Sequence, residues 1–176
     1  PMKKVILVFL LLCATRIAPA QYKPVEQGST LTFVIRNLGF GVNGSFKGFD
    51  GAINFDPQNP EAGNFDVTIN AATVNTDNNL RDEHLRGDSF FDVKNHPKIR
   101  LVSTKINGKN GTYVFTGQLT IKGKTKAVSF PFTAAENPDG YLFKGSFRLK
   151  RKDFGVGGTS TVSDELEVML NVIAKK

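Results

Sequence analysis

The fold is decided by a stretch in which every second residue is apolar, Phe65-Asp-Val-Thr-Ile-Asn-Ala71. Successive side chains of a β-strand point to opposite faces of a sheet, so strict alternation predicts a strand with one buried face. The same period of two recurs through most of the chain. It predicts strands at about residues 30–35, 42–55, 65–71, 99–106, 113–121, 128–133, 142–149 and 166–174.

The connections between these strands are short and rich in Gly, Asn and Pro, which is the chemistry of hairpin turns. Gly44, Gly48 and Gly51 interrupt the second strand, and glycines inside a strand usually mark the bulges that a closing sheet needs. The sequence therefore predicts an all-β fold, an eight-stranded antiparallel β-barrel with sequential pairing. Such a barrel either fills with side chains or holds one small ligand.

The alternation breaks once, between Asn78 and Val93, where Leu80, His84 and Leu85 follow helical spacing. Asp77 or Asn78 can act as an N-cap, and Gly87 can end the helix. We expect one short helix near one end of the barrel. It has too few apolar residues to plug the interior, so we expect it to lie over the mouth.

The first twenty residues have the features of a secretory signal peptide. Lys3 and Lys4 precede an apolar run from Val5 to Leu12, and Ala18-Pro-Ala20 supplies small residues for cleavage after Ala20. The run is too short to span a membrane. We expect a leader at residues 1–20 that is removed, a single mature domain at residues 21–176, and a periplasmic or secreted protein.

Cys13 is the single cysteine of the chain and lies in the expected leader, so no disulfide is expected in the mature protein. Lipidation at Cys13 is disfavoured by the bulky Leu11-Leu12 that precedes it. The net charge of +7 includes Lys3, Lys4 and Arg16 of the leader. The remaining excess is mild, and export removes most nucleic acid from reach, so we expect no nucleic-acid partner.

The mature chain has two histidines, His84 and His96, without metal-ligand spacing, and we expect neither a metal site nor an enzyme. We consider three roles for the acidic helix around Asp82, Glu83 and Asp88: capping and salt bridges, ligand contact, and catalysis. The chain has 15 Phe, all but Phe9 in the mature part. Composition alone leaves open whether they form a dry packed core or line a ligand cavity.

Five ordered motifs carry a family resemblance. They are Phe33-Val-Ile-Arg-Asn-Leu-Gly39 with Gly44-Ser-Phe-Lys-Gly-Phe-Asp-Gly51, Arg81-Asp-Glu-His-Leu85, Phe90-Phe-Asp-Val93 with His96-Pro97, Gly117-Gln-Leu-Thr-Ile-Lys-Gly123 with its continuation to Val128, and Arg151-Lys-Asp-Phe-Gly155. Together they resemble the YceI-like family of polyisoprenoid-binding lipid carriers, over residues 22–174. The resemblance implies a lipocalin-like barrel with a long apolar tunnel and the helix against one end. It also implies an exported protein that binds an isoprenoid or other amphiphilic lipid, a quinone included, without enzymatic activity or a required cofactor.

The residues expected to line this tunnel point inward by the alternation; they are Phe33, Ile35, Phe46, Phe65, Val67, Phe115, Phe130, Phe143, Phe147 and Val168. The helix motif implies that Arg81, Asp82 and His84 meet a polar headgroup at the mouth, or else fix the helix to the barrel rim. Many members carry a His-Ser pair and a later histidine around the first strand. Here Gly28-Ser29 and Arg36-Asn37 stand in those places, so headgroup contacts made by those histidines are not expected.

Two other functions remain open on the sequence alone. One is a stress-response or interaction module whose barrel is packed and holds no ligand. The other is a hydrolase or isomerase that acts on a lipid near His84. A homodimer, formed through an exposed strand edge or through the helix, is compatible with the sequence.

Overall fold

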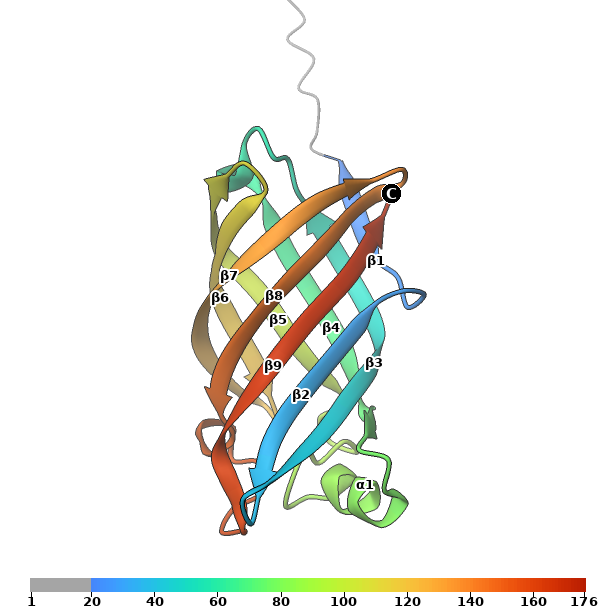
Figure 1. Ribbon diagram of the computed structural model, residues 1–176, viewed down its shortest axis with the longest axis vertical. Coiled ribbons are helices and arrows are strands. Elements are labelled where there is room, and N and C mark those ends of the chain that lie inside the picture. The colour runs from blue at the N-terminus through green and yellow to red at the C-terminus, as the bar shows by residue number, and fades with distance from the viewer. Residues whose placement is uncertain (1–19) are drawn as a thin grey trace, which may run out of the picture.

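The computed structural model describes residues 20–176, which form a closed antiparallel β-barrel (Figure 1). Its strands are β1 Gln21–Pro24, β2 Thr30–Asn37, β3 Phe40–Asn54, β4 Asn64–Asn75, β5 Lys98–Lys109, β6 Thr112–Ile121, β7 Lys124–Asn137, β8 Gly140–Lys150 and β9 Val162–Lys175. One α-helix, α1 Asn79–Arg86, and two short 3₁₀ helices, η1 Pro60–Ala62 and η2 Arg151–Phe154, complete it.

The ring of strands follows the chain order, and β2 closes it by pairing with both β3 and β9. The short β1 also pairs with β3 and β9, farther along the same two strands, so β1 and β2 together occupy one position in the ring. The predicted eight-stranded, lipocalin-like barrel is therefore confirmed, with nine strands in eight positions. The sequence missed β1 because four residues ending in a proline are too few to show alternation.

The glycines of β3 mark irregularities, as predicted. The pairing of β3 with β4 shifts register between Ser45 and Lys47 and again between Lys47 and Asp50. Gly48 has φ +76° and Gly51 has φ +122°, backbone conformations that a residue with a Cβ rarely adopts. Bulges bend a strand and increase its twist, which lets β3 follow the curve of the barrel.

Helix α1 follows β4 and lies at one end of the barrel (Figure 1). The Asn78 side chain accepts a hydrogen bond from the backbone N–H of Arg81 at 3.0 Å, and the Gly87 N–H donates to the His84 carbonyl. The predicted N-cap and helix end are thus both present. The segment after Gly87 is a series of turns rather than helix, and it carries Phe90 and Phe91 back to the barrel.

The end of the barrel that carries α1 also holds η2 and the β2–β3 and β6–β7 hairpins, and we call it the helix end (Figure 1). The opposite end holds the β5–β6 and β7–β8 hairpins, and we call it the aromatic end. The expected leader, apart from Ala20, and Cys13 lie outside the described residues. Among residues 20–176, no helix combines the length and the hydropathy that crossing a membrane requires.

The close approach of Gly44 to Phe33 yields a test of the barrel interior. A Cβ at Gly44 would lie 2.1 Å from Cζ of the Phe33 ring, whereas a Cβ at Gly41 on the same strand would meet nothing within 4 Å. We expect Gly44→Ala to destabilise the protein by about 1–3 kcal/mol, because the buried ring must move. Gly41→Ala is the matched control. Urea denaturation measures the stability of both variants, and equal midpoints would contradict the close packing of the Phe33 ring on Gly44.

Candidate functional site

The aromatic end of the barrel interior is filled by packed rings. Phe55 lies at the centre, with ring centroids of five other aromatic side chains between 5.1 and 6.5 Å away. These neighbours are Phe65, Tyr113, Phe132, Tyr141 and Phe143. Most contacts are edge-to-face, the arrangement that the aromatic quadrupole favours. Rings packed in this way close the barrel at this end.

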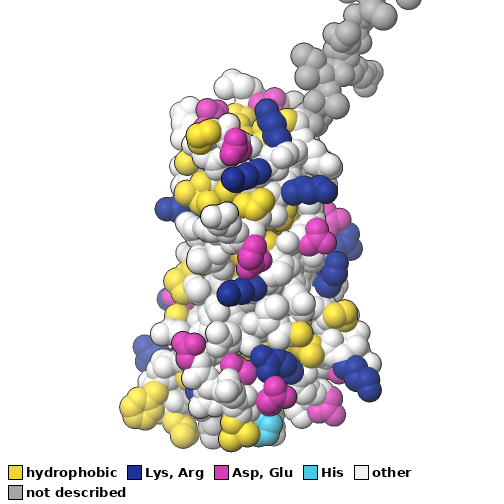
Figure 2. All heavy atoms as spheres, turned by 90° about the vertical axis from the view of Figure 1, so that its right-hand side faces the viewer, with side chains coloured by type: hydrophobic (Ala, Val, Ile, Leu, Met, Phe, Trp, Pro, Cys, Tyr) yellow, Lys and Arg dark blue, Asp and Glu magenta, His cyan; other side chains and the backbone are white. Residues whose placement is uncertain are grey.

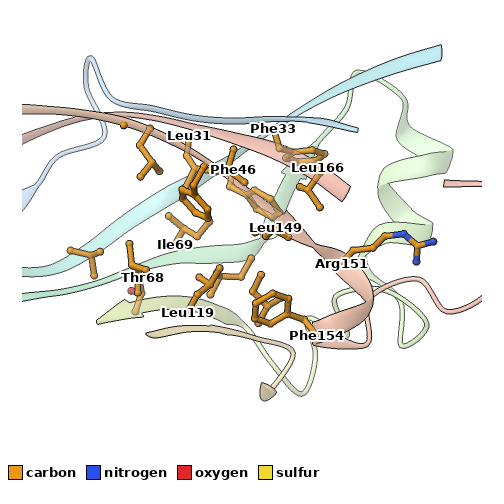
Figure 3. Close-up of a pocket in the computed structure, with 18 of the residues that line it drawn as sticks. Leu31, Phe33, Phe46, Thr68, Ile69, Leu119, Leu149, Arg151, Phe154 and Leu166 are labelled. Carbon is orange, nitrogen blue, oxygen red and sulfur yellow. The ribbon is translucent and has the colours of Figure 1, made fainter. Parts of the chain in front are cut away.

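The rest of the interior contains a cavity of about 230 Å³, which extends from these rings to the helix end (Figure 3). Its wall is almost entirely hydrocarbon. All ten residues predicted to line the interior, from Phe33 to Val168, do line it. Their role in ligand binding stays a prediction.

The inward orientation of these side chains follows from the strand pairing. Phe33 of β2 lies opposite Val168 of β9 and Gly44 of β3, and Val168 also lies opposite Phe147 of β8. The Phe33 ring lies over Gly44, whose missing side chain leaves room for it. Phe46 then contacts the Phe33 ring at a centroid distance of 5.7 Å. Inward residues of four neighbouring strands, β3, β2, β9 and β8, therefore form one continuous apolar wall.

The cavity wall also contains residues that were not predicted to line it. Leu31, Ile69, Leu149 and Leu166 lie two positions from predicted lining residues on the same strands, so the alternation could have identified them. Other strand residues extend the lining in the same way, among them Leu119 and Ile121 of β6. Further additions come from turns and from η2, where no period reveals which side chain points inward; they include Phe90, Phe91, Phe154 and Val156. The Phe91 ring contacts the Phe46 ring at 5.3 Å. These residues form the floor of the cavity at the helix end.

Only one of the three residues predicted at the mouth lines the cavity. Arg81 does so, and its guanidinium donates from Nε to Thr76 Oγ1 at 2.7 Å and from Nη2 to the Thr76 carbonyl at 2.6 Å. Asp82 is 4% exposed and accepts hydrogen bonds from the backbone N–H and the hydroxyl of Thr76. His84 is exposed and is not part of the cavity wall.

Asp82 therefore fixes α1 to the end of β4, which is the structural alternative considered for this motif. Arg86 adds to this attachment by donating from Nε to the Ala72 carbonyl at 2.9 Å and from Nη2 to the Val74 carbonyl at 3.1 Å. Charged donors bonded to backbone acceptors are among the stronger hydrogen bonds in proteins. The helix is held firmly against the barrel rim.

A second arginine at the helix end, Arg151, was not predicted as a site residue. Arg151 lines the cavity and is buried, with 4% of the residue exposed to solvent (Figure 3). Its guanidinium donates to four backbone carbonyls, those of Val156, Gly158, Val162 and Ser163, at 2.7 to 3.2 Å. None of its hydrogen bonds goes to a carboxylate. It fastens the loop between η2 and β9 over the cavity end.

The site is thus an apolar cavity closed by aromatic rings at one end and bordered by Arg81 and Arg151 at the other. Such a cavity suits a ligand with a long apolar part and a polar or anionic group near the arginines. Among residues 20–176, no group of three or more His, Cys, Asp or Glu side chains is arranged to hold a metal ion.

Comparison with known proteins identifies the family. The family model described as the YceI-like domain matches residues 22–174. The chain belongs to the YceI-like family. The "UPF0312 protein" of Pseudomonas aeruginosa is 36% identical over 172 residues, which cover 92% of this chain and 90% of that protein. A UPF0312 protein of Pectobacterium carotovorum is 34% identical over 175 residues, with 94% and 91% covered.

Solved structures of other proteins are similar to this barrel. Burkholderia cenocepacia BcnA superposes with a TM-score of 0.77 at 30% identity, covering 84% of this chain and 96% of that one. The Campylobacter jejuni YCEI protein gives a TM-score of 0.68 at 34% identity, covering 77% and 85%. A polyisoprenoid-binding domain from Saccharophagus degradans gives 0.72 at 13% identity, covering 88% and 97%, a likeness of fold alone.

Because Arg151 forms four hydrogen bonds to backbone carbonyls, we expect its substitution to have a local effect on the structure. We expect Arg151→Met to destabilise the protein by roughly 2 kcal/mol or more, because it deprives several carbonyls of a charged donor. We also expect faster amide hydrogen exchange in the loop that Arg151 holds. Lys152→Met, at an exposed neighbour, is the control. Unchanged exchange in Arg151→Met would mean that the guanidinium does not hold this loop.

Tyr141, at the aromatic end, is expected to make the stability of the protein depend on pH in the alkaline range. Burial raises the pKa of Tyr141 from 10.0 to about 12, with smaller contributions from neighbouring tyrosines and carboxylates. The folded protein then retains a proton that the unfolded chain loses, so this contribution is present below pH 10 and is lost as the pH rises from 10 to about 12. We expect Tyr141→Phe to lose less stability than the wild type over this range. Parallel losses in urea titrations at each pH would refute this assignment.

Proposed function

We propose that this protein is an exported carrier that holds one long-chain lipid, of the isoprenoid or quinone type, in its barrel and does not transform it chemically. The apolar cavity of about 230 Å³ carries this proposal. Transfer from water to an apolar site is worth about 0.8 kcal/mol for each buried methylene. A hydrocarbon chain could therefore bind tightly to this wall with few polar contacts.

The size of the cavity supports a ligand rather than a packing defect. An apolar cavity of about 150 Å³ is large enough to bind benzene. Cavities in protein cores cost about 24 cal/mol for each Å³, so a cavity of 230 Å³ left unfilled would cost about 5.5 kcal/mol. That cost is comparable with the whole stability of many domains. A bound hydrocarbon would offset it, which argues against a barrel that serves only as a packed scaffold.

The chemical difference between the two ends of the cavity favours one orientation of the ligand. The residues that line the cavity next to the aromatic end are mainly apolar, among them Ile53, Phe132 and Phe143, whereas Arg81 and Arg151 place two cationic groups at the helix end. We propose that the tail points to the aromatic rings and that a polar or anionic headgroup lies near the arginines. His84 lies outside the cavity wall, so the arrangement gives little support to catalysis at that residue.

The family and the solved structures support a lipid-binding role without specifying the lipid. The chain shares its family with proteins of similar length, and one solved structure of the same fold is a polyisoprenoid-binding domain. The leader expected at residues 1–20 supports export to the periplasm or beyond.

Filling the cavity tests the proposal. Val168 lies in the wall between Phe33 and Phe147, and Val114 is 40% exposed on β6. We expect wild-type protein, purified without detergent and extracted with solvent, to yield a long-chain lipid in mass spectra. Val168→Phe should reduce the lipid recovered per protein by about tenfold or more, because the added ring displaces several methylenes.

Val114→Phe makes the same change on the outer surface and should leave the recovery unchanged. Circular dichroism shows whether each variant is folded. Wild-type protein that yields no lipid and binds no added isoprenoid would overturn the proposed function. Equal recovery from folded Val168→Phe would place the lipid somewhere other than in the barrel.

A further inference from the structure

Most of the large apolar side chains that the barrel leaves exposed lie at one end. Within residues 20–176, the large hydrophobic residues with high exposure are Leu38, Phe40, Leu80 and Val114. Leu38 and Phe40 flank the tip of the β2–β3 hairpin and are 73% and 77% exposed, and Leu80 on α1 is 76% exposed. All three lie at the helix end, where Figure 2 shows hydrophobic side chains on the lower surface. Single exposed hydrophobics are common, but three at the end of the barrel that the cavity reaches call for an explanation.

The backbone conformation of Leu38 is unfavourable for a leucine, which supports a role for its exposed side chain outside the core. Leu38 has φ +51° and Gly39 has φ +84°, so the hairpin tip needs a left-handed conformation at both positions. Asn or Gly is favoured at the first of these positions, and a branched apolar residue is disfavoured there. The side chain is 73% exposed, so the core gains little from it. A residue that neither suits the turn nor packs inside is a candidate for contact with a partner.

Basic side chains surround the same end. Arg36 precedes the hairpin tip, and five lysines occupy the other turns and strand ends there; they are Lys94, Lys124, Lys126, Lys150 and Lys152. All six are exposed, and none takes part in the salt bridges found among residues 20–176. Exposed acidic groups at this end are fewer, namely Asp77, Glu83, Asp88, Asp153 and Glu165, and Glu83 and Glu165 are paired with Arg86 and Arg148.

We propose that the helix end docks onto the surface of an anionic phospholipid membrane, with Leu38, Phe40 and Leu80 inserted among the lipids and the surrounding cations against the headgroups. Apolar side chains that enter the interface and basic side chains that face anionic lipids are the two recognised contributions to such binding. The cavity reaches the same end, so docking would bring that end of the cavity to the bilayer. The inference rests on the proposed function, because it names the surface at which the lipid would enter or leave.

A membrane fits this surface better than a protein partner does. The three apolar side chains project from two separate elements, a hairpin and a helix, and the cations lie around them on several further turns. A bilayer accepts scattered apolar side chains because its interior is fluid. A second copy of this chain would have to place its own six cations against these six.

Vesicle binding tests the proposal directly. Full-length mature protein is mixed with vesicles of phosphatidylcholine that contain about 30% phosphatidylglycerol and with vesicles of phosphatidylcholine alone, and the bound fraction is measured by flotation. We expect binding to the anionic vesicles that weakens at high salt. Leu38→Asn combined with Phe40→Thr should lower the partition coefficient by about tenfold or more, since two apolar side chains no longer insert.

This double variant should fold at least as well as the wild type, because Asn suits the turn at position 38. Val114→Thr is the control for loss of exposed apolar surface, and it should bind vesicles normally. Lys150→Glu with Lys152→Glu should weaken binding to anionic vesicles more than Lys105→Glu with Lys109→Glu, which make the same charge change toward the aromatic end.

Wild-type protein that does not float with anionic vesicles would overturn the docking proposal, as would equal binding by the hairpin variant. Self-association that Phe40→Thr abolishes, without vesicle binding, would assign the surface to a second copy instead. A failure of the proposed carrier function can be distinguished from a failure of docking. Extraction in solution reports whether the barrel holds lipid, and the hairpin variant should retain as much lipid as the wild type.

Discussion

The pairing of β2 with β9 is the constraint on which the rest of the structure depends. Residues Thr30 to Ile35 run antiparallel to Asn171 through Leu166, and this ladder joins the two ends of the sheet into a ring. Closure removes the exposed edges of the sheet and converts one of its faces into an interior. Every inward residue of the alternating pattern then faces other inward residues across the barrel. The cavity exists because these side chains do not fill the space they enclose.

The interior is asymmetric along its length, and the asymmetry separates stability from function. At the aromatic end, packed rings around Phe55 bury a large apolar area and supply a dry core. At the helix end, the floor is built from turn residues such as Phe91 and Phe154, and two arginines border it. Arg151 and Asp82 are both buried, and each has hydrogen bonds to backbone groups that hold a loop or a helix in place. Buried charges are tolerated there because backbone and hydroxyl groups satisfy them.

Much of the site could be predicted because it lies on regular strands. The ten predicted lining residues occupy alternate positions of long strands, where a period of two indicates which side chains share a face. Arg151, Phe90 and Phe91 were not predicted as site residues, because turns have no fixed period and a 3₁₀ helix of four residues is too short to show one. The motif around Arg81, Asp82 and His84 illustrates the same limit. Arg81 and Asp82 both bond to Thr76, whereas His84 is exposed, and which of the three meets the cavity depends on how the helix packs against the barrel.

The sequence by itself determined the class of fold, the order of the strands, the bulges of β3, the capped helix and the apolar face of each strand. These features depend on residues close together in the chain. The tertiary structure decided what a local pattern does not contain: that β1 and β2 share one position, that the aromatic end is packed while the helix end leaves about 230 Å³, and that Asp82 serves as an anchor. Each of these outcomes depends on side chains and strands that are distant in sequence and meet only when the barrel closes.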